Sequence, residues 1–153
     1  MAAGVLLMGL AGLPAFQGKP RPLPDTRARK ITMYYLPIHS FVRYPIDSSL
    51  ITYKHQLEQR VRKPDQFLSR LRTSLGQAPA AASFGHQYLR VLYAVTYTDG
   101  SQQKIVVDAG GNVFWNGRSY KGSRALDHVL ESPITPHNRE RLGMGPDGNR
   151  PGK

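Results

Sequence analysis

Five apolar residues recur at every second position in the segment that runs from Leu89 to Tyr97. They are Leu89, Val91, Tyr93, Val95 and Tyr97. Successive side chains of a β-strand point to opposite faces, so in a strand these five would share one face. The pattern therefore predicts a half-buried strand, which requires the chain to build a sheet and to cover at least one side of it.

Three pairs of turn-forming residues follow this strand. Asp99 with Gly100 and Gly110 with Gly111 separate short apolar segments, and Asn116 with Gly117 supplies the left-handed backbone of a two-residue hairpin. We therefore expect a meander of four antiparallel strands, at residues 89–97, 104–108, 113–115 and 118–121.

Two amphipathic helices are expected beside this meander. The first begins near Pro64 and ends at Gly76, and the second begins at Ser123, a favourable capping residue, and ends at Pro133. Their apolar stripes are Phe67, Leu68, Leu71 and Leu75 in the first, and Ala125, Leu126, Val129 and Leu130 in the second. The predicted fold is a single small α+β domain in which two helices cover one face of an antiparallel sheet.

Two further segments complete the predicted domain. Residues 31–36 are rich in β-branched and aromatic residues and end at Pro37, which indicates another strand. Residues 51–61 fit a strand, but Leu50, Tyr53, Leu57 and Val61 also form a helical stripe. Periodicity favours the strand only slightly, and the helix remains an alternative.

The ends of the chain differ in composition from this domain. Residues 1–15 contain an apolar run of 12 residues without charge, which resembles a secretory signal and is shorter than the roughly 20 residues of a membrane span. Residues 16–30 are expected to be a basic, proline-rich linker, residues 31–132 the domain, and residues 133–153 a flexible tail. We expect cleavage near Ala15 and a periplasmic or extracellular location. The alternative is a cytoplasmic protein whose first residues form an ordinary apolar arm.

The charge of the chain restricts its partners. It has 21 basic and 10 acidic residues, which gives a formal net charge of +11, and it has no cysteine. The positive excess favours an anionic envelope polymer, a lipid surface or an acidic protein, with nucleic acid as a weaker alternative. The absence of cysteine excludes disulfides, thiolate nucleophiles and cysteine-ligated zinc.

The densest basic cluster in the predicted domain surrounds the first helix. Its members are Lys54, Arg60, Arg62, Lys63, Arg70 and Arg72. Tyr88, Trp115 and Tyr120 are candidate surfaces on which a ligand ring would stack. The interpretation that we favour is a solvated helix face with aromatic residues in the core, because a run of charge alone is a poor predictor of specific binding.

No linear motif in the chain indicates catalysis, a cofactor or a metal. The five histidines show no helical pairing that would place two imidazoles on one ion, and Asp127 with His128 is best interpreted as a pair on a helix surface. The glycines between predicted strands are explained by turns. We therefore predict a small exported basic domain that acts by binding rather than by catalysis, with no cofactor. The alternatives are a cytoplasmic nucleic-acid-binding module and a small metal-independent hydrolase or nuclease.

Overall fold

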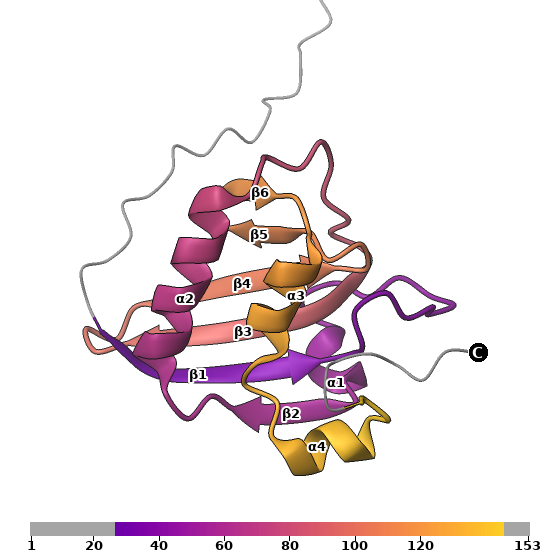
Figure 1. Cartoon of the computed structure of the whole chain (residues 1–153), viewed down its shortest axis with the longest axis horizontal. Helices are drawn as coiled ribbons and strands as arrows, with labels where there is room; N and C mark the ends of the chain where they lie inside the picture. Colours follow the sequence, from indigo (N-terminus) through magenta and orange to yellow (C-terminus); the bar gives the residue numbers. More distant parts are fainter. Residues whose placement is uncertain (1–26, 146–153) are drawn as a thin grey trace, which may run out of the picture.

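A computed structural model of the chain describes residues 27–145. This part of the chain forms a single α+β domain around a six-stranded antiparallel sheet with the strand order β2-β1-β3-β4-β5-β6 (Figure 1). The strands are β1 (Ala28–Tyr35), β2 (Leu57–Arg60), β3 (Leu89–Tyr97), β4 (Gln102–Asp108), β5 (Val113–Trp115) and β6 (Arg118–Tyr120). The helices are α1 (Ile51–Lys54), α2 (Pro64–Gln77), α3 (Arg124–Glu131) and α4 (Pro136–Arg141).

The four-stranded meander predicted from the sequence is confirmed as β3-β4-β5-β6. Its register pairs Val91 with Val107 and Val106 with Phe114, and the last hairpin pairs Trp115 with Arg118. At the tip of that hairpin Asn116 and Gly117 have φ angles of 51° and 76°. Both central residues therefore adopt the left-handed backbone of the predicted turn.

One face of the sheet is covered by α2 and α3, as predicted, and both helices lie across it in Figure 1. The Oγ atom of Ser123 accepts a hydrogen bond from the Leu126 amide at 3.1 Å and caps the start of α3. The main core lies between these layers. Its central members are Ile31, Met33, Tyr35, Val91, Tyr93, Val95 and Tyr97 of the sheet with Phe67, Leu68, Leu71, Leu75, Leu126 and Leu130 of the helices.

A second, smaller core lies on the opposite face of the sheet. Leu89 and Leu92 of β3 and Val106 of β4 are members, and Ile46 and Ile51 pack onto them from the segment between β1 and β2. Leu89 was expected on the same face as Val91, Tyr93, Val95 and Tyr97, but the register shifts between Leu89 and Val91, and Leu89 packs in the second core instead. Leu92, Val106 and their neighbours alternate with the residues of the main core, so they point away from α2 and α3. The second core covers only part of this face.

The segment between residues 51 and 61 combines the two conformations that the sequence left open. Residues 51–54 form α1, so the strand preferred there from periodicity is wrong, whereas residues 57–60 form β2. Asp47 Oδ1 accepts hydrogen bonds from the amides of Ser49 and Leu50, which starts the helical turn and allows Ile51 to enter the second core. Gly76 also differs from expectation, because it lies inside α2 and does not end it.

The ordered domain extends beyond both predicted boundaries. β1 begins at Ala28, inside the predicted linker, where the Ala28 amide donates a 2.8 Å hydrogen bond to Asp65 Oδ1. At the other end, residues 136–141 form α4, and Ile134 and Met144 are buried in the main core. The prediction of a flexible tail from residue 133 is therefore wrong for residues 133–145. The burial of Ile134 and Met144 was not predicted, because the many glycine and proline residues of this segment suggested a chain without packing.

The predicted signal, most of the linker and residues 146–153 lie outside the described residues. Within residues 27–145, no helix has the length and the apolar character needed to cross a bilayer.

Replacing Gly117 with Val is expected to destabilise the domain. A β-branched residue resists the positive φ of 76°, so the free energy of unfolding should fall by about 1–2 kcal/mol and the melting temperature by several degrees. Thermal denaturation followed by circular dichroism measures this change.

Gly76→Ala is the matched control, because no atom lies within 4 Å of the added Cβ and the position is helical. This variant should melt at or above the temperature of the parent. Unchanged melting of the Gly117→Val protein would contradict the turn assignment.

Candidate functional site

The face of the sheet opposite α2 and α3 carries a row of basic and polar side chains beyond the edge of the second core. Because side chains alternate along a strand, Lys30, Thr32 and Tyr34 of β1 point away from Ile31 and Met33, which are buried in the main core. Ala94 and Thr96 of β3, with Gln102 and Lys104 of β4, point to the same side by the same alternation. These residues line one groove with a volume of about 540 Å³, which we call the open-face groove.

The strand register places the groove residues in two neighbouring rows across the sheet. In one row Arg60 of β2 pairs with Thr32, Thr32 with Ala94, and Ala94 with Lys104. In the other row Lys30 pairs with Thr96 and Thr96 with Gln102. Three cations from three strands therefore surround a strip of hydroxyl and amide groups.

Lys30 and Lys104, which line the groove, and Arg60, which the register places beside it, are exposed and have no carboxylate partner. Within the described part of the chain, the side chains of Lys30, Arg60 and Lys104 make no hydrogen bond or ion pair. Glu58 precedes Arg60 by two residues on the same face of β2, but its carboxylate lies 3.8 Å from His55 Nε2. The groove consequently presents uncompensated positive charge, which attracts an anion.

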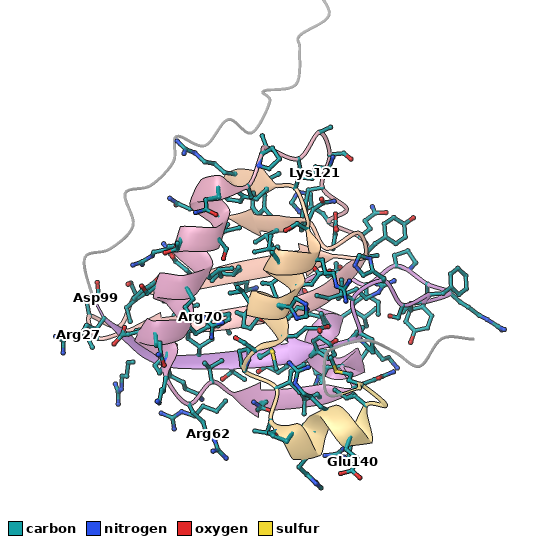
Figure 2. All side chains as sticks on the ribbon, viewed as in Figure 1. Arg27, Arg62, Arg70, Asp99, Lys121 and Glu140 are labelled. Atoms are coloured by element: carbon teal, nitrogen blue, oxygen red, sulfur yellow. The ribbon has the colours of Figure 1, made fainter. Side chains whose placement is uncertain are left out.

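The structure separates the basic cluster predicted from the sequence. Lys54 lies on α1, Arg62 and Lys63 precede α2, and Arg70 and Arg72 lie on α2. Arg62 and Arg70 are seen beside one end of that helix in Figure 2. Of the six predicted residues, Arg60 is the one that the register aligns with the groove. Sequence reasoning missed Lys30 and Lys104, because their proximity to Arg60 depends on the order of the strands.

Two of the three candidate stacking residues, Trp115 and Tyr120, lie in or against the main core, as the favoured interpretation of core aromatic residues expects. Trp115 is only 4% exposed and belongs to the main core, and the guanidinium of Arg72 lies 5.6 Å from its ring centroid. This cation–π contact shields the ring from a ligand. Tyr120 is partly buried against the same core, so of the three candidates Tyr88 keeps a largely exposed ring, at 51%.

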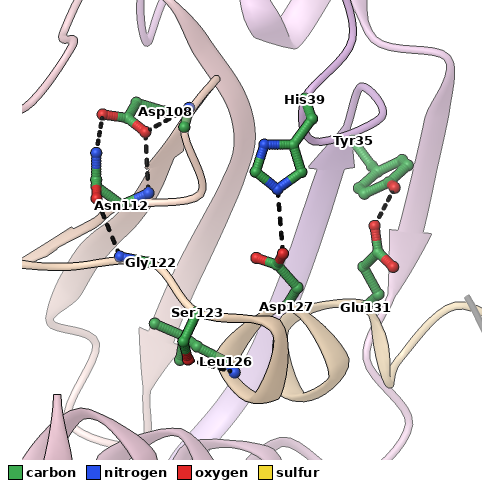
Figure 3. A network of polar contacts seen from close by, with 10 residues as sticks. Tyr35, His39, Asp108, Asn112, Gly122, Ser123, Leu126, Asp127 and Glu131 are labelled. Atoms are coloured by element: carbon green, nitrogen blue, oxygen red, sulfur yellow. Dashed lines mark hydrogen bonds and ion pairs between the residues drawn. The ribbon is translucent and has the colours of Figure 1, made fainter.

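A buried polar network lies near one end of the sheet, and Figure 3 shows its main contacts. Asp108 Oδ1 accepts hydrogen bonds from the amides of Gly110 and Asn112, and Oδ2 accepts from the Gly85 amide and from Asn112 Nδ2. Asn112 Oδ1 in turn accepts from the Gly122 amide at 3.0 Å. Asp108 thereby holds together three loops that the sequence treats as separate turns.

Arg90 is a second buried charged group in this region, at 3% exposure. Its guanidinium donates to the carbonyl oxygen of Ser40 through Nε and Nη2, at 3.1 and 2.8 Å, and to the carbonyl of Leu89. Burial lowers the pKa of Arg90, and the negative charge of Asp108 partly opposes that change. The arginine therefore fixes the loop that follows β1.

Asp127 pairs with a histidine that the sequence did not indicate. His39 Nε2 lies 3.2 Å from Asp127 Oδ2, although the two residues are 88 positions apart (Figure 3). The interpretation of Asp127 and His128 as a pair on the helix surface overlooked this contact, for which no linear signal exists. The His39 side chain is 59% exposed, so the pair serves best as a tether between the loop and α3.

Histidine and carboxylate side chains remain dispersed elsewhere. Within residues 27–145, no three of them converge as potential metal ligands. Tyr93 and Tyr35 direct their hydroxyls to α3, where they donate to the Leu130 carbonyl and to Glu131 respectively. Burial raises the pKa of Tyr93 well above its ordinary value, so this hydroxyl stays protonated and acts as a structural donor.

Comparison with known proteins identifies no matching family, no similar curated protein and no similar solved structure.

Replacing Asp108 with Ala is expected to destabilise the domain strongly. The substitution removes the acceptor of four hydrogen bonds and the negative charge near buried Arg90, so the free energy of unfolding should fall by about 3 kcal/mol at neutral pH. Urea denaturation measures this value.

Asp99→Ala provides the comparison, since Asp99 accepts from the amide and hydroxyl of Ser101 in an exposed turn. It should lose less stability than the Asp108 variant. Equal losses in the two variants would show that Asp108 is not the centre of the network.

Proposed function

We propose that this protein binds an extended anionic polymer of the cell envelope along its open-face groove. The observation that carries the proposal is the alignment of Lys30, Arg60 and Lys104 on one sheet face without carboxylate partners. Unpaired charges that repel one another destabilise a fold slightly, so their gathering on one face is best explained by an anionic ligand.

The spacing of the cations favours a polymer over a single small anion. Neighbouring strands lie about 4.8 Å apart, so Arg60 on β2 and Lys104 on β4 are separated by three spacings, or about 14 Å. A small phosphate or carboxylate ion would contact one of these cations at a time. A chain with repeated anionic groups would contact all three.

The groups between the cations support binding rather than catalysis. Thr32, Thr96 and Gln102 offer hydroxyl and amide groups that donate hydrogen bonds to oxygen-rich ligands. Tyr34 adds a half-buried aromatic ring at the edge of the groove, where it meets His55 edge to face at 5.3 Å. These groups are suited to hold a polyanionic sugar or phosphodiester chain.

The envelope location is the second part of the proposal and rests on residues 1–15. Their uncharged apolar run is followed by a basic linker, as in exported proteins. We predict a mature form that begins near Phe16. Mass spectrometry of the N-terminal peptide from the native host measures this, and recovery of only the full-length chain would contradict export.

Charge removal in the groove should weaken polymer binding more than equal charge removal elsewhere. The test variant is Lys30→Gln with Arg60→Gln and Lys104→Gln, and the control is Arg62→Gln with Lys63→Gln and Arg70→Gln. Each lowers the formal charge from +11 to +8, because each removes three cations. Binding of a labelled heparin oligosaccharide, measured by fluorescence anisotropy, should weaken about tenfold or more in the groove variant and only slightly in the control.

The salt dependence of the same experiment distinguishes specific from diffuse attraction. A single-stranded oligonucleotide serves as a second probe. When log affinity is plotted against log salt concentration, the slope for the groove variant should be less negative than that of the parent by about 2, because three phosphate contacts are lost. Equal losses of affinity in the two triple variants would show that binding depends on net charge alone, and would contradict the proposal. A strong preference for the oligonucleotide over oligosaccharides would favour a nucleic-acid-binding function instead.

A further inference from the structure

The loop between β1 and α1 has an aromatic tip, in which Val42 packs partly against the second core whereas Phe41 and Tyr44 belong to neither core. This tip, residues 41–45, projects beyond the end of the sheet (Figure 1), and we call it the aromatic loop. Phe41 is 88% exposed and Tyr44 is 48% exposed. Removing apolar surface from water is favourable, so the exposure of these two rings indicates that the loop contacts an apolar partner.

The exposed aromatic residues are not scattered over the domain. In the described part of the chain, the large hydrophobic side chains that are exposed all come from segments around the second core. They are Phe41 and Tyr44 of the aromatic loop, Tyr53 of α1 and Tyr88, which precedes β3. The second core and the open-face groove occupy the same face of the sheet, and the aromatic loop lies beyond the end of the sheet, next to the second core.

Both ends of the aromatic loop are fixed to the domain. At its start, His39 contacts Asp127, and the carbonyl of Ser40 accepts two hydrogen bonds from buried Arg90. At its end, the Ile46 amide donates to Gln87, and the carbonyl of Ile46 accepts from Leu89. The base of the loop is therefore held in place, so binding of a partner costs less conformational entropy than it would for a free loop.

From these observations we propose that the aromatic loop inserts into the interface of an anionic lipid surface. The tip combines Phe41 and Tyr44 with the exposed cation Arg43, and residues 31–46 contain no acid. Aromatic rings and basic side chains are the groups that settle at the headgroup level of a bilayer. The formal net charge of +11 adds attraction toward anionic lipid.

A lipid surface suits the tip better than a protein partner. A protein interface needs paired polar groups that fix its register, and the side chains of the tip offer for this purpose only Arg43 and the Tyr44 hydroxyl. The excess of basic over acidic residues, 21 to 10, matches a surface of uniform negative charge. This insertion does not depend on polymer binding in the groove.

Tryptophan fluorescence tests the insertion directly. The natural Trp115 is buried, so its emission provides a constant background that the parent protein measures. In Phe41→Trp the added indole should emit at long wavelength in buffer. It should shift to shorter wavelength on vesicles of phosphatidylglycerol and phosphatidylcholine. Thr73→Trp, at an exposed position of α2 on the other side of the sheet, is the control and should not shift.

Vesicle co-sedimentation gives the second measurement. Phe41→Ala should lower partitioning onto these anionic vesicles about tenfold. Arg43→Gln should lower it about fivefold, and should have little effect on pure phosphatidylcholine. Both side chains are exposed, so circular dichroism should show a native fold.

Three results would overturn the insertion. They are an unshifted emission from Phe41→Trp, unchanged partitioning of Phe41→Ala, and no vesicle binding by the parent. The heparin oligosaccharide separates this inference from the groove. Phe41→Ala should bind that probe as the parent does, and a loss there would show that the tip belongs to the polymer site and does not insert into lipid.

Discussion

The burial of alternate side chains of β3 against α2 and α3 is the constraint on which the rest of the domain depends. Val91, Tyr93, Val95 and Tyr97 are each no more than 1% exposed, and they occupy the middle of the main core. A shift of this strand by one residue would move all four to the other face and expose them. The same alternation fixes Ala94 and Thr96 on the opposite face, so the packing of the main core determines where the open-face groove lies.

The opposite face is divided by the limited size of the second core. Ile46 and Ile51 cover Leu92 and Val106, which occupy the row that begins at Tyr34. The next two rows, which contain Thr32 and Lys30, are lined by polar and basic residues and remain open. A boundary between an apolar and a basic surface thus runs across the sheet at Tyr34. The open-face groove lies on the basic side, and the aromatic loop follows β1 on the apolar side.

The sequence predicted the features that local physics controls. The meander from Leu89 to Tyr120, the tight turn at Asn116, the cap at Ser123 and the two core helices depend on periodicity and on preferences of single residues. The four-residue helix α1 was only an alternative to a strand, because a helix this short depends on one contact, the burial of Ile51. Helix α4 was missed because its segment gains order mainly from two isolated anchors, Ile134 and Met144.

The candidate site was less accessible to sequence reasoning, for a topological reason. Arg60 was identified within a dense local cluster, but Lys30 and Lys104 are isolated in sequence and join it only through the order β2-β1-β3-β4. The pairing of His39 with Asp127 likewise depends on a loop and a helix that are far apart in the chain. Trp115 kept both a core and a ligand-facing interpretation, because an aromatic residue in a short strand has the same sequence pattern in either position.

The most direct test of the groove is an NMR titration of the isotopically labelled protein with a heparin oligosaccharide at moderate salt. Our account predicts that the largest amide shift changes fall on the strands of the groove. The amides concerned are those of Lys30, Thr32, Arg60, Ala94, Thr96, Gln102 and Lys104. Changes concentrated instead around Arg62, Lys63 and Arg70 would place binding beside α2 and contradict the assignment of the groove.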